Sequence, residues 1–271
     1  MSGHLIVCPT PIGNLEDVTL RVLSSLREAD VIACEDTRRS RVLLDRYGAR
    51  GQLVSYHDHN ERERSPELVA RMRAGAVVAL VSDAGMPLIS DPGYALVQAC
   101  VAAGLAVEVL PGPSAVLAAL VASGLPAEHW RFAGFLPRKR SELRELFAGN
   151  VETLVAFESP QRTGKSLAVL AELDGQRPVA VCRELTKLHE EVLRASAAEL
   201  AERYASDAPR GEVVLVVGAA PPAKSDEAEA VEAVRALIEA GAKKRAAATV
   251  ISGLTGVSAN KLYRALTGSG G

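Results

Sequence analysis

The stretch Val77–Gly93, VVALVSDAGMPLISDPG, decides how this sequence folds. It begins with an apolar, valine-rich run, which predicts a buried strand that ends at Ser82. The residues that follow are rich in glycine and proline, so the strand opens into a turn with little conformational freedom to lose. Ligands of α/β proteins bind at this kind of place, beyond the carboxyl end of a strand.

A second stretch repeats this arrangement. Val107–Leu110 predicts another strand, and the sequence LPGPSA at Leu110–Ala115 ends it with a similar turn. We expect the two strands to be neighbours in the sheet, so that their loops form one wall of backbone N–H and C=O groups. Glycine lets such a wall approach a ligand closely. The alternative is a pair of ordinary turns that end strands and bind nothing.

The composition indicates a soluble globular protein with room for two domains. The chain has 271 residues, 48% of them hydrophobic and 24% charged, which is ordinary for an enzyme. Because the net charge is −2, any contact with nucleic acid must come from local clusters of cations. The isolated residues Cys8, Cys34, Cys100 and Cys182 are typical of small buried side chains in a reducing compartment. Neither a signal peptide nor a membrane helix nor a metal-ligand motif is evident, so we expect a cytoplasmic protein without a membrane or metal partner.

Strands alternate with helices over the first part of the chain, which predicts a mostly parallel sheet with helices on both faces. The expected strands are Leu5–Cys8, Val31–Cys34, Val54–His57, Val77–Val81 and Val107–Leu110. The second half predicts a more mixed α/β domain. Its strands are expected near Trp130 and at 151–157, 179–182 and 213–217. The predicted division is an α/β domain at 1–117, a second α/β domain at 118–218, a linker at 219–225 and a helical region at 226–271.

Three helices are expected in the last region. The first runs from about Asp226 to Glu239, the second from about Lys243 to Leu254, and the third contains Leu262 and Tyr263. The short turn at Gly256 between the last two gives a spacing like that of a helix-turn-helix. The alternative is a helical pair that docks on the body of the protein or on a dimer partner.

An ordered series of motifs resembles one family, the class III methyltransferases related to tetrapyrrole methylases. Within that family the motifs are most similar to the branch that methylates ribose 2′-oxygens of small-subunit ribosomal RNA, and the resemblance covers about Leu5 to Val217. The motifs are PTPIGNLEDVTLRVL (9–23), CEDTRRSRVLL (34–44), VSDAGMPLISDPG (81–93), LPGPSA (110–115), FAGFLPRK (132–139), FESPQR (157–162) and RELTKLHEE (183–191).

The resemblance implies two α/β domains of the tetrapyrrole methylase type, with S-adenosylmethionine in the cleft between them, and a homodimer. It implies 2′-O-methylation of a cytidine in the decoding region of 16S ribosomal RNA, either as naked RNA or in the assembled small subunit. Met86 stands where this branch usually has threonine, a change that matters little if the loop acts through its backbone. The cofactor contacts implied are Pro11, Asp83, Gly85, Met86, Ile89, Ser90, Ser114, Ala115, Phe157, Leu185, Gly211, Glu212 and Val213.

Methyl transfer to a ribose hydroxyl needs help, because the hydroxyl is a poor nucleophile. A base, or a cation that lowers the hydroxyl pKa, would supply it. The candidates are Glu158, Glu184 and Lys187, which follow strands of the second domain. The alternative role for these three residues is a structural set of salt bridges.

Cationic clusters identify the residues expected to bind RNA. Two other functions stay open: a tetrapyrrole methylase, which would share fold and cofactor, and a non-catalytic RNA-binding module, which would not need two rigid loops. The clusters and the helical region favour RNA over a flat anionic macrocycle. The clusters are Arg38, Arg39 and Arg41; Arg138, Lys139 and Arg140; and Lys243, Lys244 and Arg245.

Overall fold

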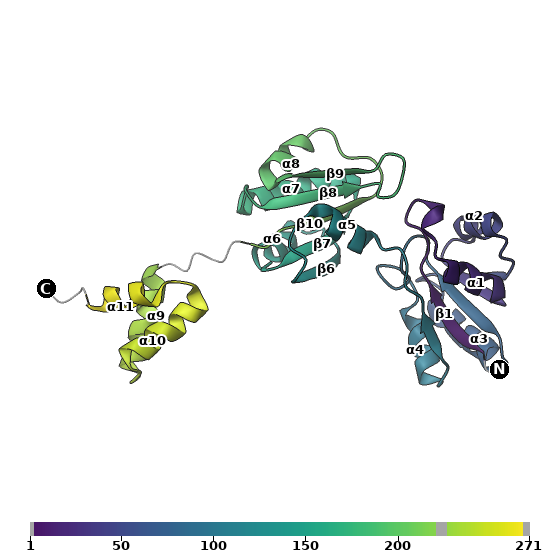
Figure 1. Cartoon of the computed structure of the whole chain (residues 1–271), viewed down its shortest axis with the longest axis horizontal. Coiled ribbons are helices and arrows are strands. Elements are labelled where there is room, and N and C mark those ends of the chain that lie inside the picture. Colours follow the sequence, from purple (N-terminus) through teal and green to yellow (C-terminus); the bar gives the residue numbers. More distant parts are fainter. Residues whose placement is uncertain (1–2, 221–226, 268–271) are drawn as a thin grey trace. The chain divides into compact units, whose positions relative to one another are not determined.

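Two five-stranded sheets with their covering helices form the larger part of the protein (Figure 1). The computed structural model describes residues 3–220 and 227–267. The first sheet is parallel throughout and has the strand order β3-β2-β4-β1-β5. Its strands are β1 His4–Cys8, β2 Val31–Cys34, β3 Gln52–Ser55, β4 Val77–Val81 and β5 Val107–Val109. The predicted parallel α/β sheet is therefore confirmed.

Helices cover both faces of this sheet because successive strand residues point in opposite directions. Leu5 and Val7 of β1 pack in a core with α3 and α4. Ile6 and Cys8 pack in a second core with α1 and α2. The elements concerned are the short helix η1 Leu15–Asp17 and the helices α1 Leu20–Glu28, α2 Thr37–Tyr47, α3 Glu61–Arg73 and α4 Tyr94–Ala102.

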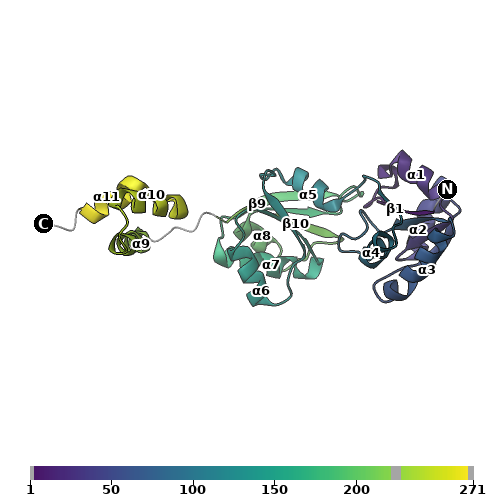
Figure 2. The same cartoon turned by 90° about the horizontal axis from the view of Figure 1, so that it is seen from below.

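The second sheet is mixed, as predicted, with the order β6-β7-β10-β8-β9. β6 and β7 are parallel, and the other pairs are antiparallel. Helix α5 packs on one face through Val116, Ala119 and Leu120, and Figure 2 shows α7 and α8 on the other side. The elements are α5 Ala115–Ser123, β6 Trp130–Phe135, α6 Arg140–Ala148, β7 Thr153–Glu158, α7 Pro160–Leu173, β8 Pro178–Arg183, β9 Glu191–Ser196, α8 Ala197–Arg203 and β10 Val213–Val217.

The expectation that β4 and β5 are neighbours is wrong. β1 lies between them and pairs with both, so that Leu5 faces Val78 on one side and Val107 on the other. A doubly wound sheet starts near its middle and grows outward in both directions, so an early strand separates later ones. As a result, the loop after β1 also reaches the edge where the two predicted loops lie.

Some boundaries differ from those expected, and one strand was not predicted. The third strand is Gln52–Ser55 and not Val54–His57, because the His57 amide donates to the Asn60 side chain and turns the chain into α3. The strand β9 escaped prediction because its partly exposed side chains lack an apolar run. All four cysteines are buried and free, as expected.

The C-terminal helices, here called the helical unit, belong to a second compact unit that also includes Phe147–Val151. Its helices are α9 Glu227–Glu239, α10 Lys244–Thr255 and α11 Ala259–Thr267, close to the expected ones. Their shared core contains Val234, Ile251 and Leu262. Residues 221–225 of the expected linker and Asp226 lie outside the described residues. Within the described ranges, no helix is both long and apolar enough to cross a membrane.

Candidate functional site

A cavity of about 430 Å³, here called the central cavity, lies among loops of the first sheet and the strand ends of the second. Both sheets belong to one compact unit. A volume in this range suits a small organic ligand. The lining residues are Ile12, Ala84, Gly85, Met86, Ile89, Ser90, Asp91, Ser114, Ala115, Val116, Phe135, Phe157, Glu158, Ser159, Pro160, Gly211, Glu212, Val213 and Val214.

Backbone hydrogen bonds join the loop after β1 to the loop after β4 at Gly85, which lines the cavity. Thr10 N donates to Gly85 O at 2.8 Å, and Gly85 N donates to Thr10 O at 2.9 Å. The Thr10 hydroxyl donates to Ser82 O at 3.0 Å, and the Ser82 hydroxyl donates to Gly85 O, also at 3.0 Å. These bonds satisfy the backbone where β4 ends and fix Gly85 in place.

The loop from Ser82 to Gly93 is backbone-strained. Leu88 and Ser90 have φ angles of 73° and 65°, and Gly85 and Gly93 have 82° and 135°. Residues other than glycine rarely adopt such angles, and they do so most often at functional sites. The loop therefore keeps a shape that the surrounding structure imposes.

Aromatic and aliphatic side chains form the apolar part of the wall. Phe157 contacts the rings of Phe132 and Phe135 with centroid distances of 5.0 and 5.5 Å. Phe135 is 62% exposed and Ile89 is 43% exposed, although both are large and apolar. Exposed side chains of this kind around a concavity are typical of a ligand site.

The structure brings most of the predicted cofactor contacts to this cavity but leaves three elsewhere. Leu185 is buried in the core beneath the cavity. Pro11 and Asp83 line a smaller neighbouring cavity. Asp83 accepts a hydrogen bond from Asp36 N at 3.1 Å and pairs with Arg39 at 3.4 Å, so its carboxylate faces the start of α2. The residues at the central cavity are Gly85, Met86, Ile89, Ser90, Ser114, Ala115, Phe157, Gly211, Glu212 and Val213.

Several cavity residues were not predicted, notably Ile12, Asp91 and Phe135. Each lies inside one of the motifs that carry the family resemblance, so its place in a motif could have identified it as a cavity residue. The sequence could not show where these side chains point, because that depends on how loops from different strands fold over one another.

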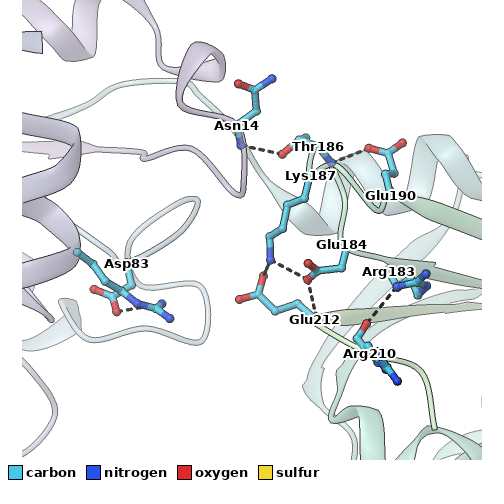
Figure 3. Close-up of polar contacts among 10 residues, drawn as sticks. Asn14, Asp83, Arg183, Glu184, Thr186, Lys187, Glu190, Arg210 and Glu212 are labelled. Atoms are coloured by element: carbon cyan, nitrogen blue, oxygen red, sulfur yellow. Dashed lines mark hydrogen bonds and ion pairs between the residues drawn. The ribbon is translucent and has the colours of Figure 1, made fainter. Parts of the chain in front are cut away.

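Glu184, Lys187 and Glu212 form one ion-paired group at the rim (Figure 3). Lys187 Nζ lies 2.8 Å from Glu184 Oε1 and 3.0 Å from Glu212 Oε2. Glu184 Oε1 also accepts from Glu212 N at 2.9 Å. The hydrogen bond from Lys187 lowers the pKa of Glu184, and the Glu212 backbone bond acts in the same direction.

Glycine is required at position 211 by this same group. Its φ is 82°, and a Cβ there would collide with the Glu184 carboxyl group. On the other side, the Thr186 hydroxyl accepts a hydrogen bond from Asn14 N at 3.1 Å (Figure 3). The ion-paired group thus holds residues 211–213 of the cavity wall against the residues that follow β8. Thr186, which is one of those residues, connects them to the loop after β1.

Glu158 has structural partners although it lies at the cavity. Its carboxylate accepts from Ser166 Oγ at 2.5 Å and from Ser159 N at 2.8 Å, and it pairs with Arg162 at 3.3 Å. Its side chain has no exposed surface. An anion at the first turn of α7 stabilises that helix, so this carboxylate is committed to the fold.

The predicted RNA contacts all have exposed side chains. Three of them are ion-paired: Arg39 with Asp83, Lys139 with Glu142 at 2.9 Å, and Arg140 with Glu172. Lys243, the N-cap of α10, precedes Lys244 and Arg245 at the helix start. Cations are unfavourable next to the positive end of a helix dipole, so helix stability does not explain why they are there.

The two sheets and the loop-walled cavity define an α/β protein with a ligand site among the ends of its strands. The chain belongs to the tetrapyrrole (corrin/porphyrin) methylases, whose family model matches residues 4–201. This confirms the family resemblance and the fold class.

Curated relatives point to one branch. The chain is 48% identical to the ribosomal RNA small subunit methyltransferase I of Mesorhizobium japonicum, over 97% of this chain and 90% of that protein. It is 44% identical to the protein of the same name from Thermotoga maritima, over 79% of this chain and 98% of that protein.

Solved structures show the same architecture. The uroporphyrin-III C-methyltransferase of Thermus thermophilus matches with a TM-score of 0.56 and 25% identity, over 80% of this chain and 94% of that one. A diphthine synthase matches with a TM-score of 0.63 and 18% identity, over 80% of this chain and 90% of that one.

Proposed function

We propose that this chain is an S-adenosylmethionine-dependent methyltransferase that acts on small-subunit ribosomal RNA. The acceptor that we propose is the ribose 2′-hydroxyl of a cytidine in the decoding region. The observation that carries the proposal is the central cavity, walled by the loops after β4 and β5, in a chain 48% identical to a relative named ribosomal RNA small subunit methyltransferase I.

The cavity residues fit the proposed cofactor. Backbone at the start of α5 offers hydrogen-bonding groups, and Gly85 lets a ligand approach the wall closely because it has no side chain. Ile89 and Phe157 offer apolar surface. Ser114, the N-cap of α5, accepts from Leu117 N and so keeps its hydroxyl at the cavity wall. S-adenosylmethionine, when bound, supplies a methyl group activated by a positively charged sulfur.

The role of the protein residues is to position the acceptor and donor. A displacement reaction gains most from correct orientation of the reacting atoms, and the bonded loops provide a rigid frame. The ion-paired group of Glu184, Lys187 and Glu212 positions the cavity residues 211–213, which come from the second sheet. Glu158 stabilises the start of α7 and thereby the neighbouring wall residues Ser159 and Pro160.

Exposed cations support RNA as the partner. Arg138, Arg38 and Arg41 are exposed at the body, and Lys243, Lys244 and Arg245 are exposed in the helical unit. Because the whole chain has a net charge of −2, these clusters supply the attraction to phosphates. We further propose a homodimer, as the motif resemblance implies.

Methyl transfer to purified small subunits tests the function directly. Subunits from a strain that lacks this methylation should accept one labelled methyl group from S-adenosylmethionine, and mass spectrometry should place it on a cytidine ribose. Incorporation into a tetrapyrrole in place of RNA would overturn the proposal and favour the other substrate class of the family.

A pair of glycine variants tests the cavity as the cofactor site. Gly85 and Gly48 both have positive φ, 82° and 69°, but only Gly85 lines the cavity. Gly85→Val should abolish S-adenosylmethionine binding in calorimetry, whereas Gly48→Val should leave it unchanged. Normal binding by a folded Gly85→Val variant would show that the cofactor binds elsewhere.

A further inference from the structure

Three carboxylates line the central cavity among the described residues: Asp91, Glu158 and Glu212. Glu158 is bonded to Ser166 and Ser159 and paired with Arg162. Glu212 is paired with Lys187. A general base needs an oxygen that can reach the substrate hydroxyl, and the carboxylate oxygens of both groups already have partners within the protein.

Asp91 differs from the other two in its surroundings. It follows Ser90, which has a φ of 65°, and it precedes Pro92, so the strained loop fixes its backbone. It is partly buried at the cavity wall. In the part of the chain that the structure describes, no lysine or arginine forms a salt bridge with it.

The groups that face Asp91 come from the carboxyl ends of the first-sheet strands. Burial raises the pKa of Asp91 to about 7, and the charges of Glu35, Asp83 and Asp58 add to this effect, while a hydrogen bond with the Ser82 side chain opposes it. The nearby Arg39 pairs with Asp83. A base with a pKa near the working pH is the most effective kind.

We propose that Asp91 is the catalytic base of the methyl transfer. This assignment rests on the proposed function. In the step, the ribose hydroxyl gives its proton to the Asp91 carboxylate, and the oxygen electron pair forms the new bond to the methyl carbon. The bond from that carbon to the cofactor sulfur breaks, and its electron pair stays on sulfur. The aspartic acid then releases the proton to water.

The test is a single-turnover measurement with small subunits and saturating S-adenosylmethionine from pH 6 to 9. The wild-type rate should rise with pH and level off above about 7, where Asp91 is ionised. Asp91→Asn should lower the plateau rate by at least about 100-fold at a cofactor concentration that saturates the variant. A rate within about threefold of wild type, or a loss explained by weaker cofactor binding, would overturn the assignment.

Two further measurements separate a base from a merely structural residue. Glu35→Gln removes the neighbouring negative charge that raises the Asp91 pKa most. The pH profile of the rate should therefore shift to lower pH. Without ligand, Asp91→Asn should melt at a higher temperature than wild type at pH 8 and at nearly the same temperature at pH 4, because a raised pKa in the folded state costs stability as the group ionises. An unchanged pH profile in Glu35→Gln, or equal melting temperatures of Asp91→Asn and wild type at both pH values, would count against Asp91.

If the wild-type chain transfers no methyl group to RNA, the proposed function itself fails, and this assignment with it.

Discussion

At the scale of single residues, Lys187 joins two carboxylates that would otherwise repel each other. Lys187→Met keeps the aliphatic stem but removes the charge, so Glu184 and Glu212 lose their cation. We expect the free energy of unfolding to fall by about 1 kcal/mol at pH 7, in the range of partly exposed charged hydrogen bonds. S-adenosylmethionine binding should weaken as well, because Glu212 lines the cavity. Thermal melts and calorimetry measure the two effects.

The effect of Lys187→Met should depend on pH. The pKa of Glu184 is lowered in the folded protein, first by the Lys187 hydrogen bond, so its stabilisation is present above the usual carboxyl pKa and is lost as the pH falls through the folded value. The difference from wild type should therefore vanish in acid. Lys139→Met is the control, since Lys139 and Glu142 are 77% and 50% exposed. Equal destabilisation by both substitutions would contradict this account.

Residue types were easier to predict than residue roles. Glu158 and Glu184 lie at strand ends, as the sequence predicts. Arg162 and Ser166, which bind the Glu158 carboxylate, lie on α7, a helix that was not predicted. Asp91 lies inside the stretch that decides the fold and was still missed. Its raised pKa comes first from burial and then from the charges of Glu35, Asp83 and Asp58. These residues lie near one another only because the parallel strands bring their carboxyl ends together.

At the scale of elements, the helical unit depends on a small core that includes Leu262, whose side chain is fully buried. Leu262→Ala should destabilise this unit by about 2–5 kcal/mol, the usual range for a buried leucine. Hydrogen exchange of the full chain should then speed up in α9, α10 and α11. Leu254→Ala removes the same groups from a side chain that is 78% exposed, so it should leave exchange unchanged. Similar exchange in both variants would show that Leu262 does not hold the three helices together.

Elements with continuous apolar runs could be predicted, whereas edge elements and neighbours in the sheet could not. β10 is buried at every position and was found from its valines. β9 is partly exposed along its length, and among the described strands it pairs only with β8, so its stability comes from the partner strand and not from its own composition. The position of β1 between β4 and β5 depends on the winding of the chain, which local patterns do not encode.

At the scale of the whole molecule, charge is distributed unevenly. Burial raises the pKa values of Glu35 and Asp91, and the negative charges of Asp83 and Asp58 add to both shifts, so acidic groups gather at this end of the first sheet. An RNA backbone would be repelled from this region unless cations elsewhere hold it. The N-terminal end of α10 carries Lys243, Lys244 and Arg245 without a helix-stabilising reason. We therefore expect the helical unit to supply a large part of the RNA affinity.

A chain that ends at residue 225 tests this expectation. It should bind small-subunit RNA more weakly, and the slope of log affinity against log salt should flatten by about 0.7 to 0.9 for each phosphate that the protein no longer binds. Affinity for S-adenosylmethionine should stay the same, because the described residues that line the central cavity lie between Ile12 and Val214. Replacing Lys243, Lys244 and Arg245 by glutamine in the full chain should reproduce much of the flattening, since the change removes charge and keeps the helices.

An unaltered salt slope in both proteins would place the phosphate-binding residues on the part of the chain that holds the two sheets. A matching loss of cofactor affinity in the shortened chain would instead show that the helical unit is required for the cavity itself.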